Sequence, residues 1–297
     1  MYAKRFSLSL LDGLLLLVLA GVLAFLGYRV SVQLNYQWNW GAIPQFLFRY
    51  DTESGRWVAN YLTQGLLTTL RLSLWASLFA LIFGFAVALA RISNSLYLRL
   101  LARTFTELMR NLPPLVIIFL FYYFLADQLV LLTGSGRIDA DSHFWLTRLS
   151  TIFLAPPAQF APFVSALITL AVFESAYVAE IARAGILSIY RGQWEACHAL
   201  GLSRWQSLRY IILPQSLRRM LPPLAGQLVS LIKDSSIVSV IAIQELTYQG
   251  SQLMASTYLT FEVWLTVAAM YLLLTFPCSI LVERLNQRLN RHQDHSA

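Results

Sequence analysis

The chain has 297 residues, of which 57% are hydrophobic and only 12% are charged, and its formal net charge is +7. Soluble domains usually carry about a quarter charged residues, so this composition excludes an ordinary soluble domain and indicates a membrane protein. The basic residues stand between apolar stretches, as they do in membrane loops, and this placement argues against a nucleic-acid partner.

The N-terminal segment, residues 1–57, begins with an apolar run over residues 6–28 that Lys4 and Arg5 precede. The run is longer than the about 7–15 residues of a signal-peptide core, and no clear small-residue cleavage site follows it. We therefore expect an uncleaved first transmembrane helix. Residues 35–57 are polar and aromatic, which is typical of a segment at a membrane interface.

Five further apolar stretches follow, each long enough to span a bilayer. They cover residues 60–90, 110–132, 160–190, 221–243 and 258–282. In the stretch 110–132, which is the third of the six spans, Pro113 and Pro114 stand near the start, where a helix tolerates residues without an N–H group. We expect a small interfacial helix over residues 143–154, and residues 245–257 join the last two spans. The predicted fold is an all-α membrane protein with six transmembrane helices.

Six spans put both termini on the same side of the membrane. Lys and Arg are concentrated on that side, which also holds the loop at residues 195–214. Because cytoplasmic loops carry the excess of basic residues, we predict that both termini and this loop are cytoplasmic.

Three ionisable residues, Glu174 in the fourth span and Lys233 and Asp234 in the fifth, are expected near the midplane. A charge there costs at least about 2.5 kcal/mol, so such groups are usually paired and functional. An amino-acid zwitterion needs a cation for its carboxylate and an anion for its ammonium, which these residues supply together with the hydroxyls of Ser235 and Ser236. The alternative is an internal ion pair that fixes helix packing, and the residues alone leave both open.

Glu180 and Arg183 lie three residues apart on one face of the fourth span, and we interpret them as a structural or gating pair. Arg110 and Asn111 are interpreted as the start of a helix with a basic anchor.

The stretch Glu195–Pro214, with the sequence EACHALGLSRWQSLRYIILP, is a polar interruption between apolar segments. We expect a short helix over residues 194–200 and a turn at Gly201, a residue that commonly follows a helix end. Ser203 is expected to cap a second helix, which Pro214 breaks or kinks.

The spacing of this stretch resembles the EAA loop of ABC-transporter membrane subunits, which has Glu-Ala-Ala, three residues, Gly, nine residues and then Ile-x-Leu-Pro. The chain departs from that pattern only at Cys197, where the family usually has a second Ala. The flanks, residues 176–193 and 221–246, resemble permeases for polar amino acids. The resemblance covers roughly residues 58–285. It implies the five-helix core of a type I ABC importer, here with one added N-terminal helix and a cytoplasmic tail at residues 286–297.

In that family the loop is a cytoplasmic coupling helix that docks in a cleft of a separate ATPase. The resemblance implies a coupling role for the residues that match, which are Glu195, Ala196, Gly201, Leu202, Ile211, Leu213 and Pro214. It also implies that the run Lys233-Asp234-Ser235-Ser236 helps to form the substrate site, because the family carries a similar run in the matching helix.

The partners that the resemblance implies are two ABC ATPase subunits, a second permease subunit that is a copy or a paralogue, a periplasmic amino-acid-binding protein and membrane lipid. The implied location is a bacterial inner membrane. The implied activity is ATP-driven import of polar or broad-range L-amino acids by alternating access.

No phosphate-binding loop of the GxxxxGKS or GxxxxGKT type, no metal-ligand spacing and no Ser-His-Asp arrangement occurs in the sequence. We therefore expect no catalytic residue, no metal and no cofactor in this chain. Two other functions stay open: a secondary transporter or channel that uses Lys233, Asp234 and Glu174 as an ion or proton relay, and a non-transporting membrane scaffold or sensor. Ionisable groups inside spans favour transport over the scaffold.

Overall fold

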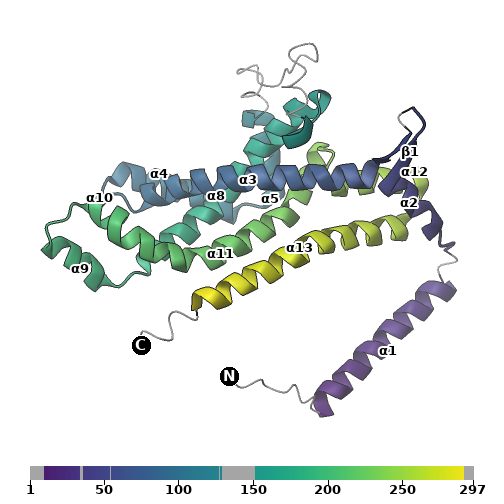
Figure 1. Cartoon of the computed structure of the whole chain (residues 1–297), viewed down its shortest axis with the longest axis horizontal. Coiled ribbons are helices and arrows are strands. Elements are labelled where there is room, and N and C mark those ends of the chain that lie inside the picture. The colour runs from purple at the N-terminus through teal and green to yellow at the C-terminus, as the bar shows by residue number, and fades with distance from the viewer. Residues whose placement is uncertain (1–9, 34–35, 54, 127, 129–150, 291–297) are drawn as a thin grey trace. The chain divides into compact units, whose positions relative to one another are not determined.

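The computed structural model describes residues 10–33, 36–53, 55–126, 128 and 151–290 (Figure 1). The chain divides into two compact units, Met1–Ala42 and Ile43–Ala297.

The first unit consists mainly of helix α1 (Leu10–Gln33), followed by the 3-10 turn η1 (Trp40–Ala42). Helix α1 is long and apolar enough to cross a membrane, so the predicted first span is confirmed from Leu10 onward. The described side chains of α1 are exposed, which suits a helix surrounded by lipid. After it, the rings of Trp38 and Trp40 stack with their centroids 5.9 Å apart.

The second unit begins with a short helix and a hairpin, formed by α2 (Ile43–Leu47), β1 (Phe48–Asp51) and β2 (Arg56–Ala59). The two strands are antiparallel, and Tyr50 pairs with Trp57. Their rings meet edge to face at 5.7 Å, a contact that stabilises a two-stranded hairpin. Within the described residues, these two short strands are the one departure from the predicted all-α fold.

Two long helices form the centre of the second unit, α3 (Tyr61–Arg91) and α8 (Phe160–Leu187). They lie side by side (Figure 1) and make the most extensive helix–helix contact of the unit. Small residues allow this approach, because a Cβ atom added at Gly84 would stand only 2.5 Å from the Cβ of Val178. These helices confirm the second and fourth predicted spans.

The prediction that the third span begins near Arg110, with Arg110 and Asn111 at a helix start, is wrong, because both residues lie at the end of a helix. Helix α4 (Leu96–Asn111) is followed by α5 (Pro114–Phe121) and the π-helical turn η2 (Tyr122–Ala126), and the chain bends by 119° between the first two. The cause is Pro113, because a proline forces the residue before it into extended backbone and so ends α4.

Helix α4 itself was missed, although it is amphipathic and buries Ala102, Thr106 and Met109 on one face. Residues 127 and 129–132 of the predicted third span lie outside the described residues. Most of the predicted interfacial helix at residues 143–154 also lies outside them, and only its residues 151–153 are described as helical.

After α8 the chain forms α9 (Arg191–Ala199), α10 (Arg204–Gln206), the π-helical turn η4 (Ser207–Ile212) and α11 (Leu213–Asp234). The helix does not break at Pro214, and it stays helical from α10 through α11. The distortion lies one turn earlier, in η4. Because proline lacks the N–H group that the carbonyl four residues earlier would accept, the backbone before it is free to widen into a π turn.

The fifth span is itself interrupted, because α11 gives way to the 3-10 segment η5 (Ser235–Ile241) and then to Ala242, whose φ of 60° is left-handed. The residues expected only to join the last two spans form helix α12 (Leu246–Thr257). Helix α13 (Thr260–Asn290) confirms the sixth span and extends beyond its predicted end.

Among the described residues, five helices are long and apolar enough to cross a membrane, or six if the bent pair α4 and α5 counts as one span. That number agrees with the six predicted spans. Two clusters of buried side chains hold α3, α8 and α11 together, one around Leu72, Leu170 and Leu231 and the other around Ile212 and Met220.

Candidate functional site

The loop between α8 and α11 has an inner side that packs against the helices. Cys197 of α9 is only 1% exposed, and Ile189, Leu208 and Ile212 belong to a buried cluster with residues of α3 and α8. The position at which the sequence departs from the EAA pattern is thus a small buried site, where Cys fits as Ala would.

The two turns of the loop form as their sequence predicts. Gly201 has a φ of +70° and follows the end of α9. Its N–H bonds the carbonyl of His198, and that of Leu202 bonds the carbonyl of Cys197, both at 3.0 Å, as in a Schellman motif. Ser203 then caps α10 in a capping box with Gln206.

The residues that matched the EAA pattern divide between the outer side of the loop and its inner side, where Ile211 and Leu213 pack against the buried cluster. Glu195, Ala196, Gly201 and Pro214 are exposed, while Leu202, Ile211 and Leu213 are half-buried. Glu195 forms an ion pair with Arg191 at 3.1 Å, but both side chains are largely in solvent, so the pair contributes little to stability.

Large apolar side chains are exposed on the same loop. Leu200 is 74% exposed, Trp205 is 61% exposed and Tyr210 is 67% exposed. An acid beside exposed aromatic side chains, on a segment whose inner side is fixed, is typical of a surface that binds another protein.

Arginine side chains tie the loop to the neighbouring helices. Arg204 donates to the carbonyl oxygen of Ile92, and Arg219 donates to that of Ser188. The first bond joins the loop to the end of α3, and the second joins α11, just after the loop, to the end of α8.

A second group of polar residues lies between α8 and α11. The Glu174 side chain is fully buried and accepts a hydrogen bond of 2.9 Å from Nε2 of Gln227. Its other oxygen, Oε1, has no hydrogen-bond partner among the described residues. Asp234, at the end of α11, is close enough to interact electrostatically with Glu174. The structure therefore brings together two of the three charged residues predicted near the midplane.

Lys233 also interacts electrostatically with Asp234, although its side chain is exposed while Asp234 is half-buried. The Ser235 hydroxyl donates to the carbonyl oxygen of Ile232 at 2.7 Å, and Ser236 is half-buried. The run Lys233-Asp234-Ser235-Ser236 thus lies where α11 changes into η5, with its members facing different surroundings.

A third group lies nearer the loop and is centred on Glu180. This carboxylate forms the predicted ion pair with Arg183, and it also pairs with Arg91 of α3 and, at 3.7 Å, with Arg110 of α4. The two added arginines were missed because they come from other helices, and no local spacing connects them to Glu180.

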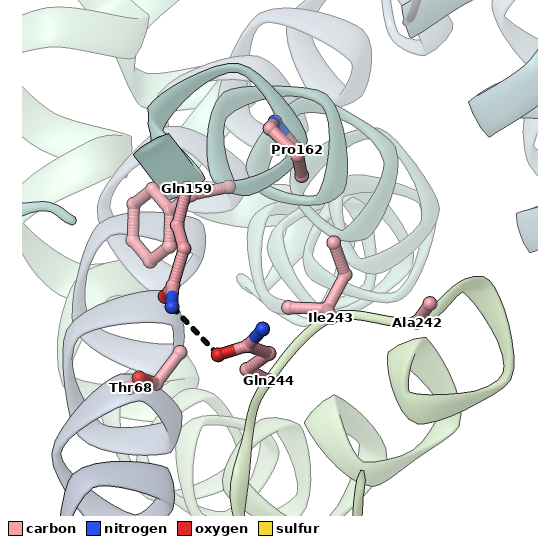
Figure 2. Close-up of a pocket in the computed structure, with 7 residues that line it drawn as sticks. Thr68, Gln159, Pro162, Ala242, Ile243 and Gln244 are labelled. Carbon is pink, nitrogen blue, oxygen red and sulfur yellow. Dashed lines mark hydrogen bonds between the residues drawn. The ribbon is translucent and has the colours of Figure 1, made fainter. Parts of the chain in front are cut away.

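A cavity of about 130 Å³ lies where η5 ends (Figure 2). Thr68 of α3, Gln159 at the start of α8 and Gln244 point toward one another, and Nε2 of Gln159 donates to Oε1 of Gln244 at 2.6 Å. Sequence reasoning missed this cavity because its polar residues are uncharged and come from three distant segments.

Beside this cavity, Glu245 fixes the start of α12. Its carboxylate is fully buried and accepts hydrogen bonds from the N–H groups of Thr247 at 2.9 Å and Tyr248 at 2.8 Å. The hydroxyls of Tyr271 at 2.8 Å and Thr69 at 3.3 Å also donate to it. Burial raises the pKa of the Glu245 carboxyl, whereas these hydrogen bonds oppose the rise. The hydrogen bonds of the Glu245 carboxylate therefore hold α12 against α3 and α13.

Comparisons with known proteins agree with this arrangement. A family profile described as "Binding-protein-dependent transport system inner membrane component" matches residues 80–291. The chain is 36% identical over 223 residues to the glutamine transport system permease protein GlnP of Escherichia coli (strain K12), over 74% of this chain and 90% of that protein. It is 28% identical over 253 residues to the glutamate/aspartate import permease protein GltK of Escherichia coli O6:H1, over 85% of this chain and 99% of that protein. A solved structure described as "Crystal structure of an amino acid ABC transporter with histidines" matches with a TM-score of 0.60 and 31% identity, over 77% of this chain and 94% of that chain.

Proposed function

This chain belongs to the family of binding-protein-dependent transport system inner membrane components, and we propose that it is the membrane-spanning subunit of an ATP-driven importer of amino acids. The amino-acid substrate is supported by the relatives, which are named as permeases for glutamine and for glutamate and aspartate. ATP is hydrolysed on a separate subunit, because no phosphate-binding loop occurs in this sequence.

The observation that carries the proposal is the geometry of the loop Glu195–Pro214. Its inner side is packed on the helices, and its outer side presents Glu195 together with Leu200, Trp205 and Tyr210. Such a surface suits a cleft on the ATPase. When two ATPases close on their nucleotides, they pull the loops of two permease subunits together and change which side of the membrane the pathway faces.

The assembly needs three further partners. A second permease subunit, identical or related, encloses the pathway with this one, and a soluble binding protein delivers the amino acid from outside. The loop and both termini face the cytoplasm of a bacterium, which is supported by the concentration of Lys and Arg on that side. Lipid covers the remaining apolar faces.

Within the membrane, Glu174 and Asp234 bind the substrate ammonium. This role is supported by the buried Oε1 atom of Glu174, which has no hydrogen-bond partner among the described residues. Lys233 and Ser236 complete the site where the second subunit approaches, and Ser235 holds the start of η5 through its hydrogen bond to Ile232.

The first test is co-purification of the ATPase with wild-type permease and with Glu195→Arg. The charge reversal is expected to remove the ATPase or to uncouple its activity from transport. Glu53→Arg, in the exposed turn between β1 and β2, is the matched control and should leave the complex intact.

Two results would contradict the proposal. Wild-type permease that never associates with an ATPase in mild detergent would exclude the importer. Transport that continues without any ATPase would instead favour a secondary transporter with Lys233, Asp234 and Glu174 as its relay.

A further inference from the structure

A cavity of about 240 Å³ lies next to the one in Figure 2, between α3, the start of α8 and the start of α12. Its polar lining includes Gln64, Thr68, Arg71, Gln159, Gln244 and Gln249. Three of these, Thr68, Gln159 and Gln244, also line the smaller cavity, so the two spaces adjoin. A third space of about 480 Å³ shares Gln64, Gln244 and Gln249 and is more open.

One lining residue is a cation inside a transmembrane helix. Arg71 lies ten residues into α3, which is roughly 15 Å at 1.5 Å per residue, and its side chain is half-buried. Within the part of the chain that the structure describes, it forms no ion pair and no hydrogen bond. A membrane protein rarely keeps such a charge without a function.

A second lining residue is an amide without a partner. Gln249 is only 7% exposed, yet its carboxamide makes no hydrogen bond to any described residue. The carboxamide is not among the fully buried, unsatisfied groups, so its polar atoms reach the cavity and can donate to and accept from a ligand there.

Among its described lining residues, the cavity has no anion to match its cation. No Asp or Glu is among its lining residues, and the nearest carboxylate along the chain, Glu245, is already bonded to two N–H groups and two hydroxyls. A guanidinium binds a carboxylate through two parallel hydrogen bonds, and carboxamides bind uncharged polar groups as donors and acceptors. A ligand with a second positive charge would have no counter-ion here.

We propose that this cavity is an outer binding subsite for the transported amino acid, in which Arg71 binds the α-carboxylate and Gln244 and Gln249 bind a polar uncharged or acidic side chain. The inference rests on the proposed function and adds a preference against basic amino acids. The segment η5, about 14 Å long at 2 Å per residue, separates Gln244 from Asp234. A ligand therefore passes along η5 from the outer subsite to the pair Glu174 and Asp234.

The test measures equilibrium binding to the permease–ATPase complex in nanodiscs without the binding protein. The probes are L-glutamine, L-glutamate, L-arginine and L-glutamine α-amide, which lacks the carboxylate. Wild type is expected to bind glutamine and glutamate more tightly than arginine, and glutamine about tenfold to a hundredfold more tightly than its α-amide.

Substitutions of the lining residues show which side chains cause this difference in affinity. Arg71→Ala should abolish the discrimination between glutamine and its α-amide, and Arg71→Lys should keep part of it because the charge remains but the two-pronged geometry is lost. Gln249→Glu should shift the preference toward arginine. Arg56→Ala, at an exposed position in β2, is the control and should behave as wild type.

The inference is overturned if wild type binds none of the probes, or if Arg71→Ala still co-purifies with the ATPase and still prefers glutamine to its α-amide. Failure of the proposed function looks different. In that case the wild-type complex with its binding protein shows no ATP-dependent uptake of any amino acid into proteoliposomes.

Discussion

At the scale of single residues, Glu180 has the largest number of charged partners in the described chain. Three arginines from α3, α4 and α8 surround it, and the Arg91 side chain is only 10% exposed. One carboxylate thus holds three helices by charge, and removing it leaves a nearly buried guanidinium without its counter-ion.

We therefore expect Glu180→Gln to destabilise the protein by about 1–3 kcal/mol, the cost of leaving a buried polar or charged group unsatisfied. Thermal unfolding of purified protein measures the effect. Glu283→Gln, which changes an exposed carboxylate on α13, is the control and should change stability by less than about 0.5 kcal/mol. Equal losses in the two variants would show that the charge cluster does not hold the helices.

At the scale of helices, α3 approaches α8 closely at Gly84. The space there is already filled, since an added Cβ would stand 2.5 Å from Val178 and 2.8 Å from the carbonyl oxygen of Ser175. Gly226 of α11 differs, because nothing lies within 4 Å of an added Cβ.

These two glycines make a matched pair. Gly84→Ala is expected to force the helices apart and to destabilise the protein by about 1–3 kcal/mol. Gly226→Ala should instead be neutral or stabilise it by up to about 1 kcal/mol, because alanine favours a helix. The measurement is again thermal unfolding, and a Gly84→Ala protein as stable as wild type would contradict the packing described for α3 and α8.

The helices also show what local sequence can and cannot predict. Gly201 and Ser203 behave as predicted, because a left-handed turn and an N-cap depend on the chemistry of a few neighbouring residues. Pro214 does not, because the effect of a proline depends on whether the surrounding helix can absorb it, here through a π turn. The transmembrane spans could be predicted from the length of the apolar runs. The bend before Pro113 could be predicted only by giving the effect of that proline on the backbone more importance than the apolar run around it.

The residues of the candidate sites differ in the same way in how far the sequence could predict them. The loop that carries Glu195 is contiguous in sequence, so its spacing was sufficient to find it. The partners Arg91 and Arg110 of Glu180, and the glutamines around Arg71, come from segments far apart in sequence and meet only after folding. Arg71 alone gave a signal, as a cation within an apolar span.

At the scale of the whole molecule, four clusters of buried apolar side chains hold the second unit, and none of their described members precedes Ile43. Replacing residues 1–42 by an unrelated single-span helix of the same orientation is therefore expected to shift the melting temperature by less than about 2 °C, which corresponds to less than about 1 kcal/mol. Size-exclusion chromatography after heating measures this shift. A loss of the monodisperse peak at a much lower temperature would mean that the first helix supports the core.

The helical stretch Arg204–Ile241 begins in the loop Glu195–Pro214 and ends beside Ala242 at the cavity of Figure 2. Its 38 residues correspond to roughly 55 Å of helical chain, with the π turn η4 near one end and the 3-10 segment η5 at the other. When a segment of that length moves as one body, a tilt of only about 5° displaces its far end by about 5 Å. In the proposed importer, a movement imposed by the ATPase on the loop would therefore reach the cavity through a tilt of this segment, without a chain of side-chain rearrangements in between.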